Sequence, residues 1–167
     1  ALIFDIGGGS TELVLVETSG PGPRILDWQS APWGVVSLTE SEPVDWADAD
    51  ARLAAYARMQ ARVRDAFSPI AQRLPRDRDG VRLLGTSGTV TTLASLHLDL
   101  PRYDRQQIDG LIVPSASMRA ISQRLSRMSL RERQQVPCIG TERADLVVAG
   151  CAILECILDI WPSERLG

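Results

Sequence analysis

The sequence predicts an α/β domain in which a mixed sheet is flanked by helices. Two observations lead to this prediction. Near the amino end, short apolar segments alternate with glycine-rich turns, which is typical of strands joined in a β-meander. Behind them, apolar residues recur at helical spacing, and a further buried strand interrupts the helical part. The order βββαβα, followed by additional carboxyl-terminal helices, predicts a ribonuclease-H-like core.

The amino-terminal strands are expected at residues 2–6, 11–17 and 24–30. The first is an apolar run that ends at the sequence Gly-Gly-Gly-Ser. The second is apolar on both faces through Leu13–Val16, as in a buried strand. A turn rich in glycine and proline at 19–23 separates it from the third.

The segment 31–45 contains Pro32, Gly34 and Pro43, and is expected to be a loop with a short turn of helix. From Trp46 to about Leu74, apolar residues recur at helical spacing and arginines lie largely on the outer side, which predicts an amphipathic helix. The charged run 73–82 is expected to be a solvated loop.

The remaining chain is expected to be mostly helical. A buried strand at 81–84 leads through a glycine-containing turn into a helix that ends near Leu98. A short strand is expected at 110–113, stopped by Pro114. Further helices are expected at 115–127, 129–135 and 141–160.

Size and composition restrict the function classes. The 167 residues suffice for one domain with a core, but not for two full lobes of a phosphotransferase. The net charge of −3 gives no support for nucleic acid or an anionic membrane as partner. No signal sequence or membrane-spanning run is present, so a cytoplasmic protein is expected. Three cysteines without paired spacing and a single histidine indicate neither a disulfide framework nor a His/Cys metal site.

The first motif is the hairpin tip between Asp5 and Glu12. Its glycines allow φ > 0 and a close approach to a ligand, and successive amides can converge on phosphate oxygens. The two carboxylates are expected to face each other across the hairpin, which a hydrated Mg²⁺ bridging to phosphate would compensate. The phosphate-binding residues are expected to be Gly7, Gly8, Gly9, Ser10 and Thr11. The alternative is a flexible hairpin tip with solvated acids.

The second motif lies between a buried strand and a helix and consists of Gly85, Thr86, Ser87, Gly88 and Thr89. A helix N-terminus presents free N–H groups and the positive end of the helix dipole, which suits a phosphate or a nucleotide. The alternative is that Ser87 or Thr89 is a plain N-cap.

The third motif opens the last long helix at Glu142–Gly150. Thr141 is the expected N-cap, with acidic residues in the first turn. Gly150 inside a helix costs roughly 1 kcal/mol relative to alanine, so a close packing contact is expected there. Arg143 is a candidate for contact with a phosphate or guanine, and an ion pair with Asp145 is the equal alternative.

Together, four segments resemble the Ppx/GppA family of exopolyphosphatases and guanosine pentaphosphate phosphohydrolases. They are DIGGGSTELV at 5–14, LLGTSGTVTTLA at 83–94, Leu130–Arg133 before Val136-Pro137, and ERADLVVAGCAIL at 142–154. The resemblance spans essentially the whole chain and points to the second lobe of a protein with an actin-like ATPase fold. It implies that Asp5 and Glu12 place Mg²⁺ and orient the attacking water. It also implies that residues 7–10 cradle the terminal phosphates of polyphosphate or guanosine pentaphosphate, with residues 85–89 as a second phosphate-facing loop.

The resemblance also implies that something belongs before Ala1, where the chain runs straight into a core strand. In the family, the first phosphate loop and the catalytic-base glutamate lie in the preceding lobe, and neither occurs here. The chain is therefore expected to be one lobe of a longer protein and nearly inactive alone, because phosphoryl transfer needs both walls of the cleft. Its expected partners are the missing amino-terminal lobe and a second copy of itself. The alternatives are a non-catalytic sensor of guanosine phosphates or polyphosphate, and an ATP-binding relative of the chaperone or kinase type.

Overall fold

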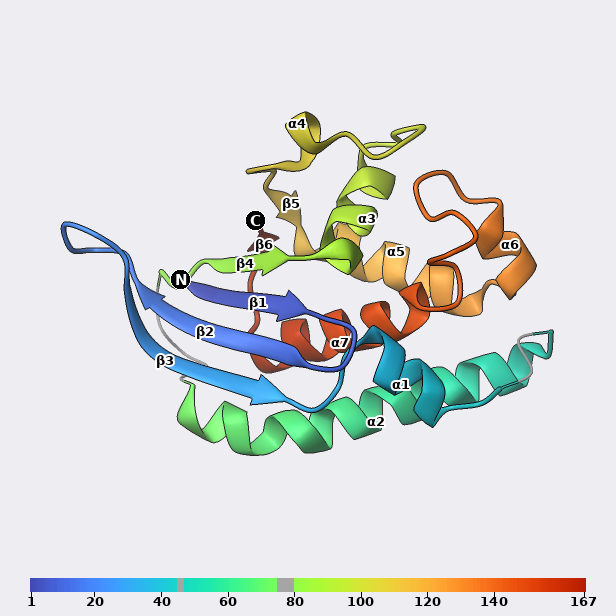
Figure 1. Ribbon diagram of the computed structural model, residues 1–167, viewed down its shortest axis with the longest axis horizontal. Helices are drawn as coiled ribbons and strands as arrows, with labels where there is room; N and C mark the ends of the chain where they lie inside the picture. The colour runs from blue at the N-terminus through green and yellow to red at the C-terminus, as the bar shows by residue number, and fades with distance from the viewer. Residues whose placement is uncertain (45–46, 75–79) are drawn as a thin grey trace.

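The computed structural model describes residues 1–44, 47–74 and 80–167, which form a six-stranded mixed sheet packed against helices (Figure 1). The strand order is β3-β2-β1-β4-β6-β5. The pairs β3–β2, β2–β1 and β6–β5 are antiparallel, whereas β1–β4 and β4–β6 are parallel. The strands are β1 (Leu2–Ile6), β2 (Thr11–Glu17), β3 (Arg24–Ala31), β4 (Leu83–Thr86), β5 (Val113–Pro114) and β6 (Arg165–Leu166).

Seven helices accompany the sheet in the described residues. They are α1 (Val35–Ser41), α2 (Ala49–Arg73), α3 (Gly88–His97), α4 (Arg105–Ile108), α5 (Ser115–Arg127), α6 (Leu130–Gln134) and α7 (Val147–Ile160). Helix α7 packs against both α2 and α5, which also contact each other, and α5 in turn contacts α3. None of the described helices is long and apolar enough to cross a membrane.

The sheet and helices meet in one core. In β1, Leu2, Phe4 and Ile6 are buried, while the alternate residues Ile3 and Asp5 face the other side of the sheet. This alternation follows from the two-residue period of a strand. Helix α7 is buried at every position from 147 to 158, as expected for a helix with apolar residues on all sides, and Glu155 is the charged residue within this range. The core therefore lies between the sheet and this central helix.

The meander and the main helices agree with the sequence prediction, but the last helix begins later than expected. The predicted start at 141 is wrong: α7 begins at Val147, and residues 141–146 form turns. Thr141 is therefore not its N-cap, which is Leu146. The Ala144 carbonyl explains the difference, because it accepts from the guanidinium of Arg133 (Nε–O 2.6 Å) rather than from a helical amide. Arg133 is fully buried, and burial lowers its pKa to about 10.

Other boundaries differ less. Helix α1 spans two turns in the segment expected to be mostly loop, and the strand expected at 110–113 is reduced to β5. Helix α4 and strand β6 were not predicted, because each contains too few residues to show a period. Helix α2 begins after Asp48, whose carboxylate accepts from the amides of Asp50 and Ala51. The expected helix start at Trp46 and the loop residues 75–79 lie outside the described residues.

The predicted close contact at Gly150 is confirmed. A Cβ atom at this position would lie 2.3 Å from Oγ1 and 2.6 Å from Cγ2 of Thr89. The absence of a side chain on α7 thus lets the first turn of α3 pack directly on its backbone. This contact sets the position of the α3 N-terminus relative to α7.

Candidate functional site

The three predicted motifs meet at one end of the sheet. The turn between β1 and β2, the start of α3 and the turn before α7 all line a cavity of about 210 Å³. Its walls are formed by Ile6, Gly7, Gly8, Val35, Gly88, Thr89, Thr92, Arg143, Leu146 and Val147. Parallel pairing of β1 with β4 brings the two glycine-containing turns together, because the carboxyl ends of both strands lie at the same edge of the sheet.

The triple-glycine turn is held from behind by the start of α1. All three glycine carbonyls accept hydrogen bonds from the first residues of this helix: Gly7 from Val35 N (2.9 Å), Gly8 from Val36 N (2.8 Å), and Gly9 from the Ser37 hydroxyl (3.2 Å). In a trans peptide the N–H points opposite to the preceding carbonyl. The amides of Gly8, Gly9 and Ser10 therefore point away from α1, toward the open side of the turn.

These amides remain available to a ligand. Within the described residues, none of the amides of Gly8, Gly9 and Ser10 donates to another backbone carbonyl. Three consecutive free N–H groups in a turn form a favourable binding surface for an anion such as phosphate. None of the three glycines has φ in the left-handed region, so the expectation that the turn uses positive φ is wrong. At Gly9 the absence of a side chain instead leaves open space, since an added Cβ would meet nothing within 4 Å.

Gly34 allows α1 to approach the turn so closely. A Cβ atom at this position would lie 2.4 Å from the Gly7 oxygen and the Gly8 carbonyl carbon. Both are backbone atoms, so no side-chain rotation relieves the overlap. Sequence reasoning did not identify Gly34 as a site residue, because the requirement arises from a turn 26 residues earlier that packs against it.

The two carboxylates stand opposite each other as predicted. Asp5 on β1 pairs with Glu12 on β2, so both side chains lie on the same face of the sheet. Glu12 Oε1 accepts from the hydroxyls of Ser10 (2.6 Å) and Ser30 (2.9 Å). These two serines therefore hold the Glu12 carboxylate in position, and Asp5 is exposed to solvent beside it. Sequence reasoning missed Ser30, which pairs with Glu12 across the β2–β3 ladder.

This pair of acids suits Mg²⁺ better than a metal that needs many protein ligands. No group of three or more His, Cys, Asp or Glu side chains that could hold a metal occurs among the described residues. Mg²⁺ keeps several waters and is commonly held by one or two carboxylates together with substrate phosphates. Because two serine hydroxyls already bond Glu12 Oε1, the other oxygen of Glu12 and the carboxylate of Asp5 are the atoms that could hold such an ion.

The threonine at the end of each predicted loop, Thr11 or Thr89, is buried in the structure. Thr11 is fully buried, and its hydroxyl donates to the Trp33 carbonyl at 2.7 Å. It therefore does not face a phosphate, and its inclusion among the phosphate-binding side chains was wrong. Thr89 is also largely buried and packs against Gly150, but it still lines the small cavity. Neither threonine showed this in the sequence, because burial on one side of a turn depends on the element that covers it.

The second predicted loop joins β4 to α3. Ser87 occupies the N-cap position of α3, but its side chain caps no helical amide. Its hydroxyl donates instead to the carbonyl of Ile6 (2.8 Å), the last residue of β1. The neighbouring Thr86 hydroxyl donates to the Phe4 carbonyl at 3.3 Å. The alternative of a plain N-cap by Ser87 is thus wrong, and both hydroxyls connect the second loop to β1.

Arg143 lies beside this loop. A Cβ at Gly88 would be 3.9 Å from the Arg143 guanidinium, and Arg143 Nη1 donates to Thr92 Oγ1 at 3.4 Å. The ion pair with Asp145 is absent from the described residues. The guanidinium therefore keeps most of its donors for a ligand in the adjoining cavity.

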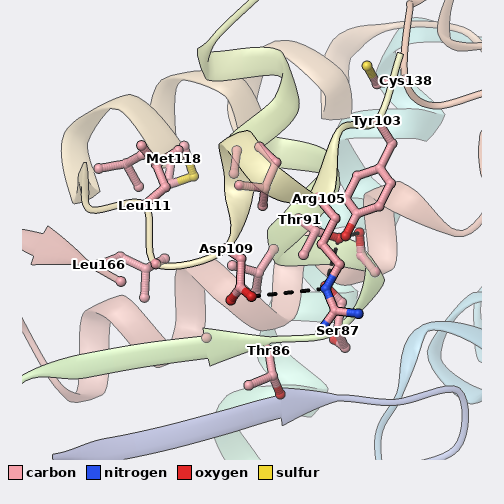
Figure 2. Close-up of a pocket in the computed structure, with 18 of the residues that line it drawn as sticks. Thr86, Ser87, Thr91, Tyr103, Arg105, Asp109, Leu111, Met118, Cys138 and Leu166 are labelled. Carbon is pink, nitrogen blue, oxygen red and sulfur yellow. Dashed lines mark hydrogen bonds and ion pairs between the residues drawn. The ribbon is translucent and has the colours of Figure 1, made fainter. Parts of the chain in front are cut away.

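A larger cavity of about 710 Å³ adjoins the small one, and Arg143 and Gly88 line both. Figure 2 shows Tyr103 and Arg105 on one side of this cavity and the apolar Leu111, Met118 and Leu166 on the other. At its rim, Arg105 Nε and Asp109 Oδ2 are 4.0 Å apart and both exposed. The lining is mainly apolar and includes the aromatic ring of Tyr103. Thr86 and Ser87 of the second loop also line it.

Solved structures that share this fold include proteins named as exopolyphosphatases or as members of the Ppx/GppA family. An exopolyphosphatase-like protein superposes with a TM-score of 0.82 at 28% identity, covering 95% of this chain and 48% of its own. An exopolyphosphatase from Cytophaga hutchinsonii superposes with a TM-score of 0.81 at 23% identity, and covers 99% and 51%. The Aquifex aeolicus member of the Ppx/GppA family gives 0.80 at 24% identity, and covers 99% and 50%. These matches confirm the expected ribonuclease-H-like lobe of the actin-like ATPase fold.

Sequence relatives agree. Exopolyphosphatase 2 of Mycobacterium tuberculosis is 30% identical over 158 residues, which are 92% of this chain and 46% of the relative. A bifunctional 3-dehydroquinate synthase/phosphatase of Fusobacterium nucleatum is 28% identical over 168 residues, which are 98% of this chain and 23% of the relative. The chain thus spans about half the length of the Mycobacterium relative and about a quarter of the length of the Fusobacterium relative.

The family assignment rests on nearly every residue of the chain. The sequence model of the Ppx/GppA phosphatase family matches residues 1–166, which include both glycine-containing turns, the opposed carboxylates and Arg143. The chain belongs to the Ppx/GppA phosphatase family.

Proposed function

We propose that this chain is the phosphate-binding lobe of a Mg²⁺-dependent phosphohydrolase that removes the terminal phosphate from inorganic polyphosphate or guanosine pentaphosphate. One observation carries the proposal. The free amides of residues 8–10 lie in the turn of the hairpin whose two strands carry the opposed carboxylates of Asp5 and Glu12, so anion donors and cation ligands share one hairpin. The name of the Mycobacterium relative, an exopolyphosphatase, supports the same substrate class.

The residues of the turn have distinct tasks in this proposal. The amides of residues 8–10 bind the oxygens of a terminal phosphate and orient it. Asp5 and the free oxygen of Glu12 would hold Mg²⁺ through a small number of direct or water-bridged contacts. When bound, the ion neutralises charge on the phosphate oxygens. The hydroxyls of Ser10 and Ser30 keep the Glu12 carboxylate in a fixed orientation, in which it also accepts a hydrogen bond from an attacking water.

The chain alone offers one wall of a cleft. Phosphoryl transfer depends on positioning and charge stabilisation from both sides of the transferred group. The relatives and solved neighbours named above are about twice as long as this chain or more, which supports a second lobe in the complete protein. We therefore expect the purified 167 residues to bind phosphate chains but to release phosphate at a rate close to background. Rapid phosphate release from polyphosphate by this chain alone would contradict that expectation.

The larger cavity favours guanosine pentaphosphate as a second candidate substrate. It adjoins the phosphate-binding turn through Arg143 and presents Tyr103 within a mainly apolar wall. A planar base suits such a wall, because aromatic and apolar side chains bury a ring while polar groups at the rim orient it. Polyphosphate has no group that would use this cavity. A substrate with a base would therefore gain affinity from it, whereas polyphosphate would depend on chain length.

Titration of the chain with inorganic tripolyphosphate, with and without Mg²⁺, tests the proposal. Asp5→Asn and Glu12→Gln are expected to weaken Mg²⁺-dependent binding at least about tenfold. Asp65→Asn, which removes the same charge from an exposed position on α2, is the matched control and is expected to bind as the wild type does. Binding that is independent of Mg²⁺ and of both acids would overturn the metal part of the proposal.

Competition separates the remaining candidates. Stronger binding of guanosine pentaphosphate than of an inorganic chain of equal phosphate number would favour the nucleotide substrate. Preference for ATP would favour an ATP-binding relative of the chaperone or kinase type. Tight binding without turnover by the complete two-lobe protein would favour a non-catalytic sensor.

Self-association is a further part of the proposal. Ile25 and Trp28 on β3 are 66% and 57% exposed, and β3 is an edge strand of the sheet. Exposed apolar residues on an unpaired edge strand favour association with another surface. In a purified sample, the partner surface would belong to a second copy of the chain. Sedimentation velocity at increasing concentration is expected to show a dimer. A monomer throughout the range would contradict this part.

A further inference from the structure

The backbone of Ser87 is held in a conformation that serine seldom adopts. Its dihedral angles are φ 83° and ψ 177°, a region populated almost entirely by glycine because a Cβ atom is strained there. Strain of this kind persists only where the surroundings enforce it, and it clusters at functional sites. Ser87 lines the larger cavity of the candidate site and directly precedes Gly88, the first residue of α3, which lines both cavities.

A glycine at position 87 would adopt this backbone conformation without strain but would lack the hydroxyl. The Ser87 hydroxyl donates to the Ile6 carbonyl at 2.8 Å, across 81 residues of sequence. Ile6 is the last residue of β1, and the residue after it is Gly7, the start of the phosphate-binding turn. The serine thus ties the first turn to the second, and only a residue with a short hydrogen-bond donor in this backbone conformation does so.

The same geometry leaves the start of α3 without its usual cap. An N-cap serine normally accepts from an amide of the first helical turn, but Ser87 makes no such bond. The backbone of Gly88 instead lines the small cavity together with Gly7 and Gly8. The hydroxyl is therefore used to position the two turns rather than to stabilise the helix.

We propose that Ser87 is a positioning residue that fixes the separation between the two phosphate-facing turns, and that its strained backbone is retained for this purpose. The inference rests on the proposed function, since it assumes that both turns contact one phosphorylated ligand. It assigns Ser87 a role through Ile6 and Gly7, not through direct contact with phosphate.

Two substitutions at this position separate positioning from folding. Ser87→Gly removes the hydroxyl and relieves the backbone, while Ser87→Ala removes the hydroxyl and keeps the strain. The melting temperature of the Gly variant is expected to exceed that of the Ala variant by roughly 2–6 °C and to stay close to that of the wild type. Both variants are nevertheless expected to bind tripolyphosphate at least about tenfold more weakly, because without the hydrogen bond to Ile6 the two turns can shift relative to each other.

Asp99→Gly is the matched control. Asp99 also has positive φ, at 51°, but is exposed beyond the end of α3 and outside both cavities of the site. Its replacement is expected to leave tripolyphosphate binding unchanged. In the complete two-lobe protein, Ser87→Gly is expected to raise KM for polyphosphate more than it lowers kcat, as expected for a residue that positions a binding turn.

The outcomes are distinct. A Ser87→Gly variant that binds tripolyphosphate as tightly as the wild type would overturn the positioning role. An Ala variant as stable as the Gly variant would show that the backbone is not strained, and would overturn the reason given for retaining serine. Failure of the wild-type chain to bind tripolyphosphate would instead count against the proposed function itself.

Discussion

Replacement of Gly34 by alanine is expected to displace the triple-glycine turn and to abolish phosphate binding. The added Cβ would lie 2.4 Å from the Gly7 oxygen and 2.5 Å from the Gly8 oxygen. Non-bonded heavy atoms pack at about 3.5 Å, so the turn and α1 must separate by about 1 Å. The φ of Gly34 is −127°, which any residue adopts, so the effect comes from the Cβ alone.

The cost follows from what this movement breaks. The hydrogen bonds from Val35 N to Gly7 O and from Val36 N to Gly8 O lose their geometry, at about 1 kcal/mol each. Overpacking adds about 1–3 kcal/mol. The free energy of unfolding is thus expected to fall by about 3–5 kcal/mol, and the melting temperature by roughly 6–20 °C for a domain of this size. In the complete two-lobe protein, a 1 Å displacement of the turn would be enough to reduce turnover on the order of a hundredfold.

Thermal unfolding and tripolyphosphate titration measure both effects. Gly22→Ala is the matched control, because a Cβ in that β2–β3 turn would meet nothing within 4 Å. This control is expected to keep or slightly raise the melting temperature and to leave binding unchanged. The reasoning would be refuted if Gly34→Ala unfolded within 2 °C or so of the wild type and bound tripolyphosphate normally.

Three further predictions concern the core that supports the site. Gly150→Ala would gain about 1 kcal/mol of helix propensity, yet its Cβ would meet Thr89, so we expect a lower melting temperature, partly restored by adding Thr89→Ala. A higher melting temperature for the single variant would contradict this. Tyr56→Phe removes a 2.5 Å hydrogen bond to the buried Glu155 and should cost about 1–3 kcal/mol in urea unfolding, less in a Glu155→Gln background. Burial alone would raise the pKa of Glu42, but hydrogen bonds from two arginines of α2 outweigh it and lower the pKa. The stability that Glu42 contributes is therefore present above about pH 4.5 and is lost as the pH falls through the lowered pKa, so acid unfolding of Glu42→Gln should show a weaker pH dependence below that value.

The parts of the site that depend on local sequence were predictable. A glycine run between two apolar segments identifies a hairpin, and the two-residue period of strands then places Asp5 opposite Glu12. The start of α3 after a buried strand follows from the same kind of local pattern. The requirement for Gly150 was visible as well, because a glycine inside a long apolar helix needs a packing reason.

The parts of the site that depend on residues far away in the sequence were not predictable. The sequence shows Thr11 beside the glycines, but burial against the Trp33 carbonyl removes it from the site. It allows Ser87 either to face a phosphate or to cap α3, whereas in the structure its hydroxyl donates to the Ile6 carbonyl of β1. The start of α7 was placed six residues too early, because Arg133 competes for the Ala144 carbonyl from another helix.

The turns that bear the chemistry can be read from the amino-acid sequence, since glycine runs, opposed acids and helix starts are all properties of short segments. How those turns are held depends on contacts between distant parts of the chain. Helix α1 takes every carbonyl of the triple-glycine turn and so directs its amides outward, and Ser87 joins this turn to the second. The physical reason is that hydrogen bonds between segments far apart in the chain depend on the closeness of packed backbones, which no local pattern records.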